Sequence, residues 1–124
     1  MRAADAIEKI SSNQFAWLKK HKKEVLLLCR AATAIELKWH LALIVSRITL
    51  TEAEFGKTWT LLTNWASDRK ESKIVRANAI QGLYNLLKQK PGFTRNFNEL
   101  LSDIEKENLA SLNARIKKLR SAGH

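Results

Sequence analysis

Apolar residues recur at steps of three and four along most of the chain, which is the spacing of one face of an α-helix. In 33–48 the inward positions of this pattern are Ile35, Leu37, Leu41, Ile44, Val45 and Ile48. In 72–90 they are Ile74, Val75, Ala79, Ile80, Leu83 and Leu87, and in 93–107 they are Phe97, Leu100, Leu101 and Ile104. A further helix in 14–32 places these residues inward: Phe15, Leu18, Val25, Leu26 and Cys29. No segment alternates with a period of two for long enough to form a strand, so the pattern predicts an all-α chain.

Signals for helix ends divide this pattern into separate helices. Thr33 with Glu36, and Thr51 with Glu54, have the S/T-x-x-E spacing of a capping box, in which each side chain bonds to the backbone N–H of the other residue. Pro91–Gly92 ends the helix before it, because proline cannot extend the hydrogen-bond ladder and glycine accepts a left-handed conformation. The chain therefore reads as a series of helices joined by short turns.

Two of the predicted helices have related sequences. The run LKWHLALIVSRI from Leu37 aligns with VRANAIQGLYNL from Val75 at an offset of 38 residues, and a third, weaker copy begins 37 residues later at Leu112. The aligned pairs include Lys38 with Arg76, His40 with Asn78, Leu41 with Ala79, and Val45 with Leu83. A period of this length made of helix pairs is the signature of stacked helical repeats, in which each pair buries its apolar face against its neighbours.

The second of these copies also resembles a known repeat family. Val75 and Arg76, followed by Ala79 and Leu83, are similar to the first helix of a HEAT repeat. The resemblance implies an all-α, right-handed α-solenoid of HEAT-like helix pairs, as in small bacterial single-domain HEAT-like proteins. In HEAT repeats the arginine usually pairs with an acid shortly before it, whereas here the residue six positions earlier is Lys70.

The same resemblance divides the chain into four parts within a single domain. Capping helices are expected in 1–33, helix-pair repeats in 34–68 and 69–107, and a C-terminal capping helix in 108–124, for which Asn108 is the expected N-cap. Each repeat then consists of a first helix, a short turn and a second helix.

Composition and charge narrow the class of protein. One Pro and four Gly suit helices with short turns, and a single cysteine, Cys29, allows no internal disulfide and indicates a reducing compartment. The longest apolar run, Val25 to Cys29, is too short to span a bilayer, so we expect a cytoplasmic protein with no membrane span. The net charge of +10 favours anionic partners. Most of the positive charge falls in the first helices, the turns and the chain ends, whereas the second helices are neutral or acidic.

Few residues suggest catalysis or metal binding. His40 is a polar residue within an apolar helix, which a structural histidine facing Asn78 explains. His21, Cys29 and His124 have no ligand spacing with it, and zinc needs three or four converging ligands. Since no phosphate-binding loop, catalytic triad or paired carboxylates occur, we predict a non-enzymatic protein without a cofactor.

The first function that we predict is that of a scaffold which binds another protein. The second helices of α-solenoids commonly line the concave face, where an exposed tryptophan is a natural binding anchor. The predicted surface contains Trp59 and Trp65, at least one of them expected to be partly exposed. The acidic residues beside them, expected to form a mildly acidic groove, are Glu52, Glu54, Glu99 and Asp103.

The positive charge supports an alternative function, association with nucleic acid, because phosphate contacts supply much of the affinity of such proteins. The contact residues would be Lys19, Lys20, Lys22, Lys23, Arg69, Lys70 and Lys73. A third possibility comes from alkylpurine DNA glycosylases, which are also built from HEAT-like repeats and have Trp, Asp and Arg lining a basic cleft. Trp65, Asp68 and Arg69 resemble that set, but the chain is too short to wrap a duplex and its second helices are not basic.

Overall fold

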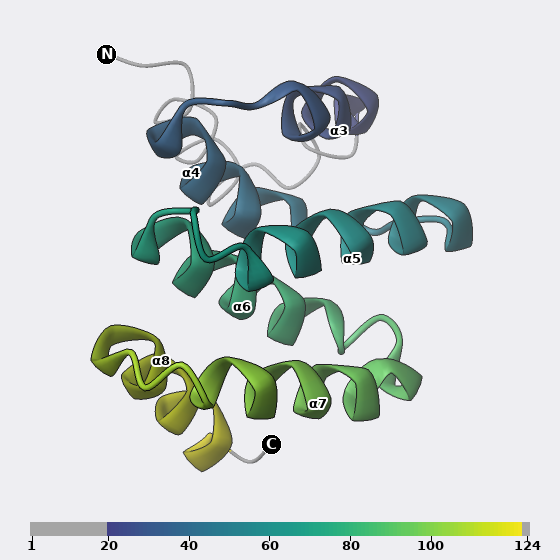
Figure 1. Cartoon of the computed structure of the whole chain (residues 1–124). Coiled ribbons are helices and arrows are strands. Elements are labelled where there is room, and N and C mark those ends of the chain that lie inside the picture. The colour runs from purple at the N-terminus through teal and green to yellow at the C-terminus, as the bar shows by residue number, and fades with distance from the viewer. Residues whose placement is uncertain (1–19, 123–124) are drawn as a thin grey trace.

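The computed structural model describes residues 20–122, and in this range the chain is all-α, as predicted (Figure 1). The elements are α3 (Lys22–Ala31), α4 (Ile35–Val45), α5 (Glu52–Ser67), α6 (Lys73–Leu86), the 3₁₀ helix η1 (Pro91–Phe93), α7 (Thr94–Glu105) and α8 (Ala110–Ser121). Four residues named above lie outside this range: Phe15, Leu18, Lys19 and His124. None of the helices between residues 20 and 122 has the length and apolar content needed to cross a bilayer.

Alternate helices pack into two rows (Figure 1). The central helix is α6, which contacts α4, α8 and, in the second row, α5; α5 also contacts α7. At the N-terminal end of the described chain, α3 packs on α4. Apolar side chains fill the space between the rows, and the fully buried ones include Leu41, Ile44, Leu62, Ile80, Leu83, Phe97 and Leu101. Most of these are predicted inward positions, because the helical period identifies the buried face of each helix.

Two residues predicted to face the core are exposed instead. Ile35 and Ile74 lie in the first turns of α4 and α6, and about half of each side chain is accessible to water. The prediction is wrong there because periodicity identifies a face of a helix, whereas the neighbouring elements decide how far along the helix that face is covered. On α3 the predicted positions Val25 and Cys29 are buried and Leu26 is partly buried.

Only one of the two predicted capping boxes forms. At the start of α5, the Thr51 N–H donates to Glu54 Oε1 over 2.9 Å, and the Glu54 N–H donates to Thr51 Oγ1 over 3.3 Å. The box predicted at Thr33 is wrong, because α4 begins one residue too late for it, at Ile35 with Ala34 as the N-cap. The spacing of a capping box therefore does not by itself locate the helix start.

The prediction for the last turn is also wrong in one respect. The N-cap of α8 is Leu109, and Asn108 instead adopts a φ of 57°. Asparagine tolerates this left-handed conformation better than most residues. Asn108 thus takes part in the reversal of chain direction between α7 and α8, directly after Glu107.

Hydrogen bonds connect α4, α6 and α8 at the spacing of the sequence repeat. Asn78 Nδ2 on α6 donates to the main-chain oxygen of Trp39 on α4 over 3.4 Å. Arg115 Nη1 on α8 donates to the main-chain oxygen of Ala77 on α6 over 3.2 Å. The 38- and 37-residue offsets align Trp39 with Ala77 and Asn78 with Arg115, so both steps use equivalent positions. His40 is buried, and its ring stacks on that of Trp39. Asn78 bonds to the main chain of Trp39, the residue before His40.

Two ion pairs are similarly placed, with their basic residues 38 positions apart and their glutamates 36 positions apart. Lys38 Nζ on α4 lies 2.6 Å from Glu71 Oε2 in the turn before α6, and Arg76 Nη2 on α6 lies 2.6 Å from Glu107 Oε2 in the turn before α8. Arg76 also donates from Nη1 to Glu107 Oε1 over 3.0 Å and from Nε to the main-chain oxygen of Ala66 over 2.8 Å. The Arg76 side chain is 2% exposed, and bidentate pairing is what makes burial of such a charge tolerable. The acid therefore follows Arg76 in the chain, instead of preceding it.

Candidate functional site

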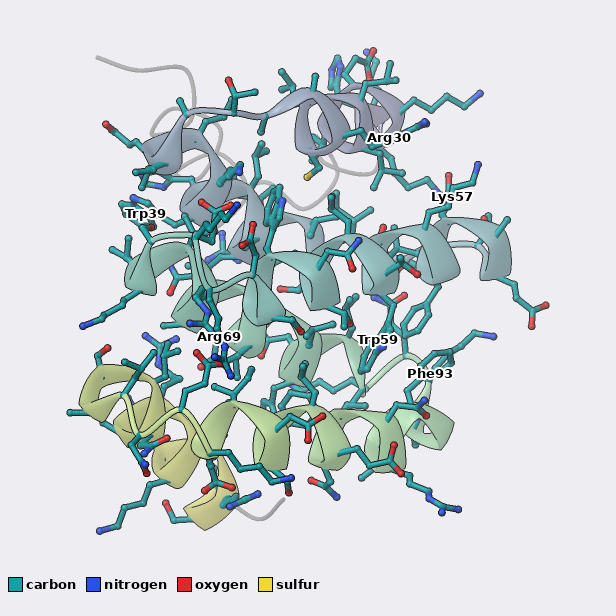
Figure 2. All side chains as sticks on the ribbon, viewed as in Figure 1. Arg30, Trp39, Lys57, Trp59, Arg69 and Phe93 are labelled. Carbon is teal, nitrogen blue, oxygen red and sulfur yellow. The ribbon has the colours of Figure 1, made fainter. Side chains whose placement is uncertain are left out.

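The two tryptophans predicted as binding anchors belong to the core. Trp59 and Trp65 on α5 are only 8% and 7% exposed, so the prediction that one of them is partly exposed is wrong. The ring centroids of Trp59 and of Phe93 in η1 are 4.9 Å apart, and Lys38 Nζ from α4 lies 5.6 Å from the ring centroid of Trp65. Figure 2 shows Trp59 and Phe93 next to each other. Their six-residue spacing does place them on different faces of α5, but each of those faces is covered by another element.

The four acidic residues of the predicted groove all have basic partners. Their ion pairs are Glu52 with Lys90 at 3.2 Å, Glu54 with Lys22 at 2.8 Å, Glu99 with Arg95 at 3.4 Å, and Asp103 with Lys106 at 3.7 Å. Hydrogen bonds from Lys22 and from the Thr51 main chain lower the pKa of Glu54. Two of the four residues begin α5 and the other two lie on α7, and each of the four pairs with a different base.

The basic residues of the nucleic-acid hypothesis form two separate groups among the described residues. The first, at the start of α3, consists of Lys20, Lys22 and Lys23. The second, between α5 and the first residue of α6, consists of Arg69, Lys70 and Lys73, all of them exposed. Lys22 contacts Glu54 in the first turn of α5, whereas Arg69 follows the end of that helix. At 1.5 Å per residue the two groups are about 20 Å apart along α5.

The glycosylase-like residues and the cysteine show no arrangement for catalysis. Trp65 is buried, Asp68 Oδ1 accepts the Lys70 N–H over 2.9 Å, and Arg69 Nε lies 3.7 Å from a Glu107 oxygen. Burial raises the pKa of the Cys29 thiol to about 12, so the reactive thiolate is scarce at neutral pH. Among residues 20–122, no three His, Cys, Asp or Glu side chains cluster as a metal site would need.

A pocket that sequence reasoning missed lies between α3 and α5. Its volume is about 270 Å³, and its mainly apolar wall includes Leu26, Leu27, Cys29, Thr58 and Leu61. Leu27 is 62% exposed, so part of the apolar wall of the pocket is open to water. A shallower groove along the outer side of α5 shares Arg30, Lys57 and Leu61 with this pocket and is otherwise lined by Glu52, Ala53, Gly56, Thr60 and Asn64. The pocket and its continuation are called the α3–α5 groove below.

Three basic side chains border the α3–α5 groove: Lys23, Arg30 and Lys57. None of the three forms an ion pair within residues 20–122. Two acids also border the groove: Glu54 binds Lys22, and Glu52 binds Lys90. Figure 2 shows Arg30 on α3 and Lys57 on α5 at the same end of the gap between the two helices. The groove therefore combines an apolar wall with an excess of positive charge at its border.

One feature of the sequence does indicate this groove. All five residues from Val25 to Cys29 are apolar, yet successive residues of a helix point about 100° apart, so one face cannot bury all five. Val25 and Cys29 face the core, which leaves Leu27 and Leu28 exposed. The helical period predicts Leu26 on the buried face of this helix, and it does not place Leu27 or Leu28 there.

Comparison with known proteins found no matching family model, no similar curated protein and no similar solved structure. The function is therefore inferred from the residues and contacts of this chain.

Proposed function

We propose that this chain is a non-enzymatic, protein-binding scaffold built from HEAT-like helix pairs. In this proposal α4–α5 and α6–α7 are the two repeats of a right-handed superhelix, and α3 and α8 cover its ends. Support comes from the contacts that recur between equivalent positions, because a stack of repeats makes the same interface at each step. The bonds from Asn78 to Trp39 and from Arg115 to Ala77 are one such pair of contacts.

The ion pairs give independent support for this repeat assignment. Lys38 and Arg76 occupy aligned positions, and each binds a glutamate in the turn that precedes the next first helix. Such a ladder fixes the register of neighbouring helix pairs. The outward side of α8 is polar, with Ser111, Lys117 and Lys118 exposed, as expected for a terminal repeat that faces water.

The single observation that favours protein binding is the α3–α5 groove. It is a concave surface with exposed leucine, and exposed apolar surface bordered by polar residues is typical of interaction sites. The groove takes the place of the surface predicted around Trp59 and Trp65, because these two side chains are buried and cannot serve as anchors.

Site-specific photocrosslinking tests this proposal. The photoreactive residue p-benzoylphenylalanine is placed at Thr60, which is exposed and lines the groove, and separately at Ser111 on the outer side of α8. After irradiation in native cell extract, we expect a small number of discrete protein adducts from position 60 and none from position 111. The absence of protein adducts at position 60 would contradict the proposal.

Association with nucleic acid remains a second candidate because Arg69, Lys70 and Lys73 are exposed beside one another, and Arg69 is 79% exposed despite its contact with Glu107. Fluorescence anisotropy with labelled duplex and single-stranded DNA and RNA tests it at about 50 and about 200 mM salt. If this candidate is correct, binding weakens steeply with salt and is lost when all three residues are replaced by glutamate. Unchanged binding in that triple variant, or no binding at the lower salt concentration, would exclude this surface.

A further inference from the structure

We propose that the α3–α5 groove binds a short, acidic amphipathic helix of a partner protein, whose aliphatic side chains enter the pocket while its carboxylates pair with Lys23, Arg30 and Lys57. This inference rests on the proposed scaffold function and specifies the chemistry of the partner. It follows from three properties of the groove, which are its volume and apolar wall, its charge, and the short side chains along α5.

The pocket has the size and lining of a site for a few aliphatic side chains. Its volume of about 270 Å³ lies below the ~300–1,000 Å³ that is usual for small-molecule and cofactor sites. Leu26, Leu27 and Leu61 supply apolar contacts, and the buried Cys29 behaves as a further small apolar group. Covering the exposed side of Leu27 removes apolar surface from water, which is the main source of affinity in such grooves.

The charge at the border of the groove selects an acidic partner. Lys23, Arg30 and Lys57 have no carboxylate partner among the described residues. The two acids at the border do not offset them, because Glu54 binds Lys22 and Glu52 binds Lys90. A ligand with carboxylates flanking its aliphatic side chains would supply the missing counter-charges. Complementary charge of this kind speeds association and disfavours basic or neutral competitors.

The continuation of the groove along α5 fits an elongated ligand. Ala53, Gly56, Thr60 and Asn64 follow one another at steps of three and four, so they lie on one side of the helix. A Cβ added at Gly56 would meet no atom within 4 Å, which leaves open space above that position. Short side chains beside an apolar pocket let a second helix lie close to α5 and place residues about one turn apart in the pocket.

The test uses the full chain and a synthetic peptide. A fluorescein-labelled peptide of about 16 residues, long enough for appreciable helix formation, carries leucines at i, i+3, i+4 and i+7 with glutamates on both sides of that stripe. Fluorescence anisotropy is expected to rise to saturation as the protein is added. The double variant Arg30→Glu, Lys57→Glu should weaken binding about tenfold or more, because two favourable charge contacts become repulsive.

A matched control separates groove contacts from overall charge. The variant Lys117→Glu, Lys118→Glu has the same net charge, but its changes lie on α8, which packs on α6 and α7. We expect its affinity to change less than about twofold, since exposed charges far from the site are screened by salt. Leu27→Gln changes an exposed side chain and should leave the fold intact while it weakens binding several-fold.

Several results would overturn the inference. One is the absence of saturable binding of the peptide to the full chain. This result counts against the inference even if another molecule, or another segment of the chain, occupies the groove. Another is an equal loss of affinity in the α8 control, and a third is equal binding of a peptide with serine in place of leucine, since either would indicate attraction by charge alone. Efficient displacement of the peptide by single-stranded DNA but not by unlabelled peptide would favour nucleic acid.

The two proposals fail in distinguishable ways. If photocrosslinking at Thr60 yields protein adducts but the acidic peptide does not bind, the scaffold function stands and the inferred partner chemistry is wrong. If the peptide binds but no adduct forms at that position, the groove chemistry is correct but the proposed function is wrong.

Discussion

Replacing Arg76 with methionine tests whether the buried ion pair holds α6 to the turn before α8. Methionine keeps an unbranched apolar side chain in the space of the arginine stem but donates no hydrogen bond. The substitution removes three hydrogen bonds, of 2.6 and 3.0 Å to Glu107 and of 2.8 Å to the Ala66 oxygen. It also leaves the Glu107 carboxylate, whose side chain is 11% exposed, without its bidentate partner.

The expected cost follows from the burial of the two partners. Removing one member of a buried ion pair costs about 3–5 kcal/mol, because the remaining charge stays desolvated. Glu107 keeps some contact with water and lies 3.7 Å from Arg69 Nε, so we expect the lower end of that range, about 3 kcal/mol. Replacing Glu107 with leucine as well removes the stranded charge. The double variant should therefore lose less stability than the sum of the two single variants.

Urea unfolding followed by far-UV circular dichroism measures these free energies. Arg69→Met is the matched control, since it removes an exposed arginine from the same glutamate and should change stability by no more than about 0.5 kcal/mol. Equal losses for Arg69→Met and Arg76→Met would refute the reasoning that burial gives the pair its importance. Strict additivity in the double variant with Glu107→Leu would refute the energetic coupling of the two residues.

Four further predictions concern single positions. Gly82→Ala should destabilise the protein by about 1–3 kcal/mol, because the added Cβ would lie 2.5 Å from the Ala42 oxygen. A Cβ added at Gly56 would meet no atom within 4 Å, so Gly56→Ala should stabilise the protein by up to about 1 kcal/mol. A lower melting temperature for Gly56→Ala than for Gly82→Ala would contradict both predictions. Hydrogen bonds from Arg76 lower the pKa of the Glu107 carboxylate in the folded protein. As the pH falls, this carboxylate is therefore protonated at a higher pH in the unfolded chain than in the folded one. Stability should therefore decline from roughly pH 5 downward, and less steeply in Glu107→Gln; equal slopes in urea unfolding across this range would argue against the pair. Because burial raises the pKa of Cys29 to about 12, a thiol reagent should label it more than about tenfold slower in the native protein than in urea, and equal rates would show that the thiol is accessible.

Much of the secondary structure was predictable because it depends on neighbouring residues. The capping box at Thr51 needs only residues three apart, and the inward positions of α7 and, except for Ile74, of α6 follow from the helical period. The aligned copies at Leu37 and Val75 predicted related helices, and in the structure the aligned residues Lys38 and Arg76 each pair with a glutamate, while Asn78 and Arg115 each bond to the main chain of the neighbouring helix. The site was less predictable, because the groove needs α3 and α5 to be brought together.

The sequence by itself determined where the helices run and which positions repeat, since propensity, capping and periodicity act within one helix. Only the tertiary structure decided what each helix face meets. Trp65 is covered by Lys38 of α4, and Arg76 takes its partner from the turn that follows α7. Leu27 stays exposed because the described elements on that side of α3 leave a pocket. Burial is a property of pairs of elements far apart in the chain, and no local pattern specifies which elements come together.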